Sequence, residues 1–254
     1  MKIQYELNPP RILNAEYFDI VHIYEGIKHL TSRAEMLKEL VDGIHLTDSV
    51  LGVARLSSIT AASYVKKICS SLNLNCSVRV RDRNVTSLSQ FVCDAILLGV
   101  HGLLILAGDE PSGDPKGSGL KPSNVLNILH ERRYDSNLAL NLSVPNKIKN
   151  KSSIQRKIDA RPNAFITQSI VSLSDLAEIV DIAKQSRINV VACIMVPSKK
   201  NISSAKAIGL NWDEYENDPI DFILKAGKIA DEVLLTSPNS FSAGIELLQE
   251  LKTN

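Results

Sequence analysis

Residues 87–107 of the chain read SLSQFVCDAILLGVHGLLILA and contain the pattern that decides the fold. Between residues 87 and 98, apolar residues recur at spacings of three and four, which is typical of an amphipathic helix. Residues 103–107 are continuously apolar over a short run, which is typical of a strand buried on both faces. The stretch therefore predicts a helix that leads into a buried strand of a parallel sheet.

The same alternation extends in both directions, with one strand and one helix in about every thirty residues. Strands are predicted at 3–7, 42–47, 77–81, 103–107, 138–142, 164–167, 190–196 and 233–236. Helices are predicted at 16–40, 57–72, 87–98, 122–131, 154–157, 173–185, 203–208 and 241–251, with an extra helix at 219–229 before the last strand. Eight such units in 254 residues predict an α/β fold, a single closed (β/α)8 TIM barrel spanning 1–254. An open Rossmann sheet is the weaker alternative, because Asn8, Pro9 and Pro10 stand where a glycine-rich turn would be expected.

Composition narrows the class of protein further. The 29 Lys and Arg residues nearly balance the 28 Asp and Glu residues, which argues against a dedicated nucleic-acid binder and against attraction to an anionic membrane. The first residues lack the apolar core of a secretion signal, and the longest apolar stretch, 95–108, is too short to cross a bilayer of about 30 Å. We therefore expect a cytoplasmic protein. The four cysteines form no metal-type spacing, so they are expected to be buried thiols, with no metal site.

Polar residues lie at or directly after the ends of three of the predicted strands, and the C-terminal strand ends form the active-site face of such barrels. Glu6 ends the first strand, where it can act as an acid if desolvated or pair with a Lys or Arg. Asp109 follows the fourth strand and is expected either to point into the barrel mouth or to form a turn. Gln168 follows the sixth strand and can pair with a heterocycle or cap the next helix. We expect Glu6, Asp109 and Gln168 to converge at one mouth.

Two other polar segments have less specific interpretations. The run 79–84 is interpreted mainly as a salt-bridge cluster directed at solvent or helices, with Asp82 and Asn84 as further site candidates. The Gly-rich segment 108–121 lacks the spacing of a phosphate-binding P-loop and is interpreted as a mobile lid. No nucleophile elbow is present, which disfavours a hydrolase.

Four ordered segments resemble the methylenetetrahydrofolate reductase family, whose members are flavin-bearing (β/α)8 barrels. They are YELNPP at 5–10, RDRN at 81–84, LGVHGLLILAGDEP at 98–111, and RKIDA at 156–160 with AFITQ at 164–168. A looser match, IMVP, lies at 194–197. Each motif alone is weakly specific, whereas the ordered set covers most of the chain.

The resemblance implies an oxidoreductase of one-carbon metabolism and methionine biosynthesis that reduces a methylene-tetrahydropterin, folate or a modified pterin, to its methyl form. It implies that Glu6 is the general acid for the bridging nitrogen, that Asp109 lies between flavin and pterin, and that Gln168 binds the pterin. It also implies that Thr47 contacts the FAD, while Gly108 is expected to let the backbone approach the flavin. NAD(P)H or another donor would supply the electrons.

The fifth-strand segment departs from the family pattern, because LNLSVP at 140–145 replaces the aromatic residue and the histidine that hold the flavin. We therefore expect FAD to bind weakly or to be lost. The alternative interpretation is a flavin-free barrel that acts as a pterin-binding or partner subunit in one-carbon metabolism. The sequence leaves both a homo-oligomer and a partner subunit open.

Overall fold

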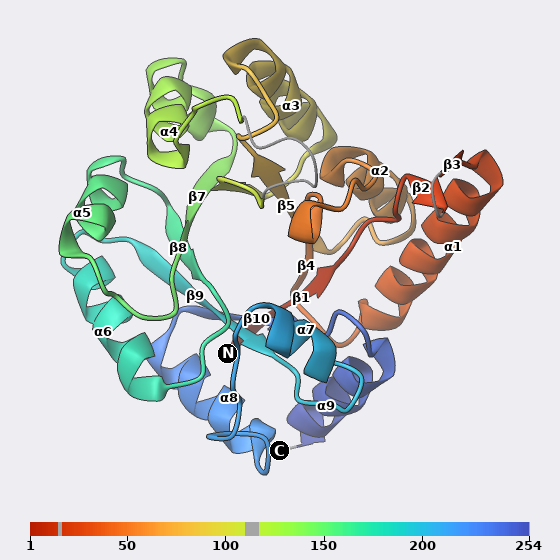
Figure 1. Cartoon of the computed structure of the whole chain (residues 1–254), viewed down its shortest axis with the longest axis vertical. Coiled ribbons are helices and arrows are strands. Elements are labelled where there is room, and N and C mark those ends of the chain that lie inside the picture. Colours follow the sequence, from red (N-terminus) through yellow and green to blue (C-terminus); the bar gives the residue numbers. More distant parts are fainter. Residues whose placement is uncertain (15–16, 110–116, 254) are drawn as a thin grey trace. The chain divides into compact units, whose positions relative to one another are not determined.

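The computed structural model describes residues 1–14, 17–109 and 117–253, and within them it confirms the α/β barrel (Figure 1). The closed barrel of parallel strands has the order β1-β10-β9-β8-β7-β6-β5-β4. Its strands are β1 Lys2–Leu7, β4 Gly43–Leu46, β5 Asn73–Arg79, β6 Gly102–Leu106, β7 Ala139–Val144, β8 Ala164–Thr167, β9 Asn189–Met195 and β10 Glu232–Thr236.

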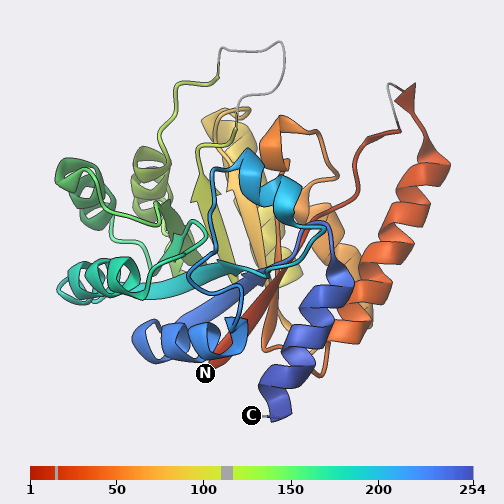
Figure 2. The same ribbon diagram turned by 60° about the horizontal axis from the view of Figure 1, so that its bottom comes forward.

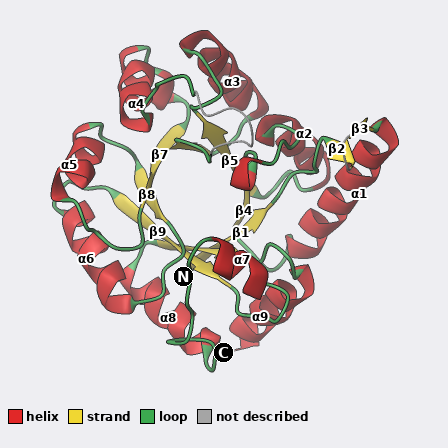
Figure 3. Ribbon diagram, viewed as in Figure 1, coloured by secondary structure: helices red, strands yellow, loops and turns green. Residues whose placement is uncertain are grey.

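Helices alternate with these strands along the chain, as Figure 3 shows. They are α1 Ile20–Leu37, α2 Ser58–Ile68, α3 Val85–Leu98, α4 Pro122–Glu131, α5 Lys151–Asp159, α6 Leu173–Lys184, α7 Ile202–Ala207, α8 Pro219–Ile229 and α9 Phe241–Thr253, with short 3-10 turns at η1 Val50–Gly52 and η2 Tyr134–Ser136. The helix α8 is the extra helix expected before the last strand. Among the described residues, none of the helices has the length and hydropathy that a membrane span requires.

Three features differ from the sequence expectation. A small antiparallel hairpin, β2 Leu13–Asn14 and β3 Tyr17–Phe18, precedes α1 and was not predicted. The strand expected at 77–81 begins earlier, because the alternating segment from Asn73 already pairs with β4. Three of the four cysteines are buried, as expected, whereas Cys93 is exposed on α3.

The chain divides into two compact units. Unit 1 contains residues 1–6, 39–42 and 143–254, and unit 2 contains residues 7–38 and 43–142. The expectation of a single domain over 1–254 stays a prediction. Each unit is described below on its own.

In unit 1, β1 pairs with β10, β10 with β9, and β9 with β8, all in parallel. Tyr5 of β1 packs edge-on against Phe241 of α9, with ring centroids 5.9 Å apart. A Cβ atom on Gly244 would overlap the Tyr5 ring, so the strand and the helix approach closely at this glycine. Because strand residues alternate between faces, Gln4 and Glu6 lie on the opposite, inner face of the sheet.

In unit 2, β4, β5 and β6 pair in parallel, and β7 extends the sheet from β6. The outer face of β5 is apolar, and Cys76 lies there against the Ser58 carbonyl of α2. The inner face is polar, which is unusual because branched apolar side chains usually fill such barrels. Its buried polar residues are His45, Asn75, Ser77, Arg79 and Asn141. The expectation that the charges of segment 79–84 point to solvent or helices is therefore wrong for Arg79, which alternation places on the inner face.

Candidate active site

Glu6 lies at the C-terminal end of β1 on the inner face of unit 1. Its Oε1 accepts a hydrogen bond of 2.7 Å from the Thr236 hydroxyl at the end of β10. Burial raises the pKa of the Glu6 carboxyl, and the hydrogen bond from Thr236 lowers it by less. The carboxyl therefore keeps its proton to a higher pH than an exposed glutamate does.

The surroundings of Glu6 decide between the two roles predicted for it. In the described part of the chain, no Lys or Arg pairs with this carboxyl. The alternative in which Glu6 forms an ion pair is therefore wrong. A nearby buried group is Cys193 of β9, whose pKa rises to about 12, first through burial and then through the Glu6 charge. The Cys193 thiol therefore stays neutral. Glu6 has neutral partners, which is an environment suited to a proton donor.

Gln168 follows β8, and its backbone N–H donates to the Val144 carbonyl at 2.8 Å. It does not cap the next helix, since Ser172 holds the N-cap of α6. Its exposed side chain lines a pocket of about 240 Å³ formed by residues 145–150 and α5. Glu6 and Gln168 thus both lie at the C-terminal ends of strands of unit 1.

Three lysines make the Gln168 pocket cationic: Lys147, Lys149 and Lys157. The Lys157 Nζ donates to the Ser143 carbonyl at 2.5 Å, and burial lowers its pKa. Lys147 lies 3.4 Å from Asp175, which offsets part of its charge. The pocket can therefore hold an anionic group next to the Gln168 amide. Sequence reasoning identified Gln168 but not these lysines, because their approach depends on how the loop after β7 folds.

Asp109 lies after β6 in unit 2, and its Oδ2 accepts a hydrogen bond of 2.8 Å from the Leu51 backbone N–H. Its own carbonyl accepts from Arg79 Nη2 at 2.8 Å, and the Ser49 carbonyl accepts from Arg79 Nη1 at 2.7 Å. Arg79 is 3% exposed and also pairs with Asp82 at 2.8 Å. One buried guanidinium thus connects the segments that follow β4, β5 and β6. The interpretation of residues 79–84 as a salt-bridge cluster is therefore right for the pair Arg79–Asp82.

The segment after β4 has an unusual backbone. Ser49 and Leu51 have φ values of 44° and 55°, in the left-handed region that residues other than glycine rarely adopt. Such conformations persist where surrounding contacts hold them, and here Asp109 and Arg79 supply those contacts. Strain of this kind is concentrated at functional sites. The sequence carries no local signal for it at Ser49 or Leu51.

The remaining site candidates have structural partners. Thr47 is buried and its hydroxyl donates to Asn8 Oδ1 at 2.7 Å. Gly108 has a φ of 92°, and a Cβ there would lie 2.5 Å from Arg79 Nε, so this position accommodates the arginine. Asn84 caps α3 by accepting from the Ser87 N–H at 2.9 Å. Flavin contacts by Thr47 and Gly108 stay a prediction.

Two buried polar atoms of unit 2 bear on whether a ring-shaped ligand fits. His45 Nδ1 and Asn141 Oδ1 have no hydrogen-bond partner among the described residues. His45 Nε2 lies 2.8 Å from the Ser77 hydroxyl, and burial lowers the pKa of His45 to about 4, so its ring is neutral. Buried polar atoms usually have a partner, so His45 Nδ1 and Asn141 Oδ1 are the atoms that a polar group reaching this face would satisfy.

Two expectations stay predictions. Residues 110–116 of the expected lid lie outside the described residues. Glu6 and Gln168 belong to unit 1 and Asp109 belongs to unit 2, so their convergence at one mouth stays a prediction.

Comparison with known proteins supports the fold. No family model and no curated protein sequence matches the chain. Among solved structures, the chain is similar to QR15, an aldolase (TM-score 0.61, 12% identity, 98% of this chain and 94% of that one), and to the long-chain alkane monooxygenase LadA (TM-score 0.63, 11% identity, 99% and 91%). It is also similar to tryptophan synthase from M. tuberculosis (TM-score 0.56, 13% identity, 98% and 89%). These are barrel enzymes of different kinds, and at such identities the likeness concerns the fold alone.

Proposed function

We propose that this protein is an oxidoreductase that reduces a methylene group on a tetrahydropterin-type carrier to a methyl group. The observation that carries the proposal is Glu6, a carboxyl with a raised pKa at the C-terminal end of a barrel strand, whose described hydrogen-bond partner is a hydroxyl. The resemblance of segments 5–10, 98–111 and 164–168 to methylenetetrahydrofolate reductases supports the choice of substrate.

Glu6 acts as the general acid in this proposal. Its proton passes to the bridging nitrogen of the methylene group, the bond between that nitrogen and the methylene carbon breaks, and an iminium forms at the other nitrogen. A hydride then adds to the methylene carbon and gives the methyl group. FAD, when bound, supplies that hydride after reduction by NAD(P)H or another donor. Thr236 orients the Glu6 carboxyl through its hydroxyl.

Gln168 and the lysine pocket bind the ligands in this proposal. The Gln168 amide can donate to and accept from a pterin edge. Lys147, Lys149 and Lys157 fit an anionic group, such as a carboxylate of the carrier tail or a phosphate of the dinucleotide. In this proposal the polar edge of the flavin ring pairs with His45 Nδ1 and Asn141 Oδ1, the unpartnered polar atoms of the inner face of unit 2. Residues 140–145 supply no aromatic side chain, which supports weak flavin binding.

The test is a reductase assay with methylene-tetrahydropterin substrates after titration of the protein with FAD and with FMN. Glu6→Gln keeps the shape but cannot deliver a proton, so methylene reduction should fall about 10²–10⁴-fold while flavin reduction by the donor persists. Glu232→Gln is the matched control, because Glu232 lies at the opposite end of β10 and pairs with Lys2 and Gln4. It should leave the rate unchanged.

Two results would overturn this proposal. Equal loss of both half-reactions in Glu6→Gln would make Glu6 structural. If no flavin binds at about 100 µM and no reduction occurs with any donor, the flavin-free alternative takes its place. That alternative, a pterin-binding or partner subunit, is favoured by the altered fifth-strand segment and predicts pterin binding without turnover.

A further inference from the structure

Two segments of unit 2 form a short antiparallel ladder that places two arginines opposite each other. Segment 10–12, which leads to the β2–β3 hairpin in Figure 2, pairs with segment 54–56, which precedes α2. Two backbone hydrogen bonds, of 3.1 and 2.9 Å, join the segments. Arg11 and Arg55 are the residues that face each other between these two bonds.

This geometry brings the side chains of Arg11 and Arg55 together on one face of the ladder. Opposite residues that exchange no hydrogen bond with each other have Cα atoms about 4.5 Å apart, and their side chains are closer than in a hydrogen-bonded pair. Like charges directly opposite each other are destabilising. Because an arginine stays charged in proteins, the pair cannot relieve this repulsion by losing a proton. A negative charge beside the two guanidinium groups would therefore stabilise the ladder.

The Arg55 guanidinium has only some of the hydrogen-bond partners that it can use. Its Nη1 donates to the Pro9 carbonyl at 2.7 Å. Its Nε is buried and has no hydrogen-bond partner among the described residues. Burial and, second, the Arg11 charge lower the pKa of Arg55. Since a buried donor without an acceptor is costly, Arg55 Nε fits an acceptor that a ligand supplies.

The chain itself provides no counter-charge for this pair. Neither Arg11 nor Arg55 forms an ion pair with another residue in the ranges 1–14, 17–109 and 117–253. Asp48 is the acidic residue nearest to Arg55 along the chain, and it pairs with Arg83 at 3.5 Å instead. Two positive charges on one face are therefore left for an anion from outside the chain.

We propose that Arg11 and Arg55 bind the phosphate monoester group of a small-molecule ligand. Such a group carries a charge of about −1.5 to −2 at pH 7 and three acceptor oxygens, so one phosphate balances both guanidinium charges, whereas a carboxylate balances only one. Its oxygens accept from Arg55 Nε and from the Arg11 guanidinium, whose forked donors match a phosphate.

The position of Arg55 in the fold agrees with a ligand site. Arg55 lies between the C-terminal end of β4 and the start of α2, and loops of this kind form the active-site face of (β/α)8 barrels. The inference is independent of the reaction proposed above. It also concerns a different site from the lysine pocket beside Gln168, which belongs to unit 1.

Two-dimensional ¹H–¹⁵N NMR of the arginine Nε–H groups tests the proposal, with inorganic phosphate and phenyl phosphate as probes at constant ionic strength. The Arg55 signal, assigned by its loss in Arg55→Lys, should shift with a dissociation constant of about 10 mM or lower. Arg11→Ala should raise that constant about tenfold or more, and acetate should bind about tenfold more weakly than phosphate. An Arg55 signal that does not respond to phosphate, or responds equally to acetate, would overturn the proposal.

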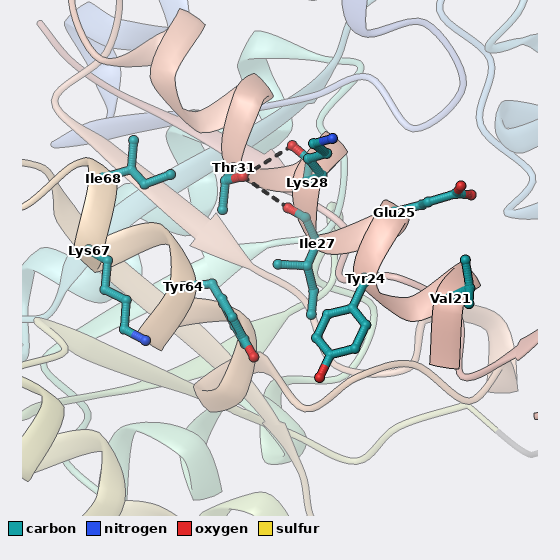
Figure 4. Close-up of a pocket in the computed structure, with 9 residues that line it drawn as sticks. All are labelled: Val21, Tyr24, Glu25, Ile27, Lys28, Thr31, Tyr64, Lys67 and Ile68. Carbon is teal, nitrogen blue, oxygen red and sulfur yellow. Dashed lines mark hydrogen bonds between the residues drawn. The ribbon is translucent and has the colours of Figure 1, made fainter. Parts of the chain in front are cut away.

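Two lysine variants are the matched controls. Lys67 lies at the other end of α2, where its ammonium is 5.2 Å from the centre of the Tyr64 ring (Figure 4). Lys67→Ala removes one positive charge from the same unit and should leave the phosphate dissociation constant unchanged. Lys149→Ala, in the lysine pocket of unit 1, should leave it unchanged as well. A response that is lost in Lys149→Ala but persists in Arg11→Ala would contradict the assignment to the arginine pair.

Arg11→Glu places a negative charge opposite Arg55 within the chain. Because Arg11 is exposed, the substitution leaves the core intact. In phosphate-free buffer it should raise the melting temperature by about 1–4 °C, since an opposite-charge pair replaces a like-charge pair. Phosphate should raise the melting temperature of the wild type but not of this variant. A melting temperature at or below that of the wild type, or an Arg55 signal that still shifts with phosphate, would refute the inference.

Discussion

Glu6 and His45 are both buried, and neither has an oppositely charged partner that would stabilise its charged form. Glu6 meets a hydroxyl and His45 meets another, so burial raises the pKa of the acid and lowers the pKa of the base. Both groups are therefore biased toward their neutral forms. For Glu6 this bias makes a proton donor, and it also has a consequence for stability.

The Glu6 carboxyl should make stability depend on pH. Because its folded pKa lies above the unfolded value, the native state binds more protons between the two values, and stability falls as pH rises through that window. Glu6→Gln removes this fall, so its melting temperature relative to the wild type should be higher at about pH 8 than at about pH 4. Thermal unfolding across this range measures the difference.

Variants of Thr236 provide the control. Thr236→Val removes the donor that lowers the Glu6 pKa and should extend the fall in stability to higher pH. Thr236→Ser keeps the hydroxyl and should follow the wild type. The same difference in melting temperature between Glu6→Gln and the wild type at every pH would contradict the raised pKa of Glu6.

At the level of elements, Arg79 fixes the segments that follow three neighbouring strands. It holds Ser49 after β4, Asp82 after β5 and Asp109 after β6. The close approach of Arg79 to the segment after β6 depends on Gly108, which leaves room for the guanidinium. The strained conformation of Leu51 depends in turn on Asp109.

Gly108→Ala should therefore destabilise the protein. The substitution forces an alanine into a positive φ and places its Cβ against Arg79, so we expect a loss of about 1–3 kcal/mol in the free energy of unfolding. Gly119→Ala is the control, since Gly119 has a φ of 74° but no atom within 4 Å of the added Cβ. Urea unfolding should show a smaller loss for Gly119→Ala. Equal losses would mean that Arg79 adjusts freely.

At the level of the whole molecule, the first strand completes its sheet with the last one. β1 pairs with β10 in the register Lys2 to Glu232 and Tyr5 to Leu235. Lys2 reinforces this pairing through its ion pair with Glu232. The helix α9 then covers Tyr5 on the outer face.

Removal of residues 1–7 should abolish cooperative unfolding, because β10 loses one of its two parallel neighbours and Phe241 loses the Tyr5 ring. Circular dichroism during thermal unfolding tests this expectation. Lys2→Ala, which removes only the partly exposed ion pair, should keep a single sharp transition. A cooperative transition in the truncated chain would show that β1 is dispensable.

The sequence predicts the barrel because strand and helix periods alternate clearly over most of the chain. It offers Glu6, Asp109 and Gln168 as site candidates because a polar residue lies near the end of one predicted strand and directly after the ends of two others. It does not predict the hairpin at Leu13 and Phe18, whose two-residue strands are too short to show a period. It also misses the contact of Arg79 with Asp109, since pairing across thirty positions leaves no local pattern.

The pairing of β1 with β10 also sets an order of events during translation. Residues 2–7 leave the ribosome before their neighbour on that side, residues 232–236, which is made more than two hundred positions later. Until then, one edge of β1 has no strand beside it, and an open edge invites pairing with other chains. The nascent protein therefore depends on slow, non-local closure. A chaperone that shields the N-terminal strand during synthesis should raise the yield of folded protein.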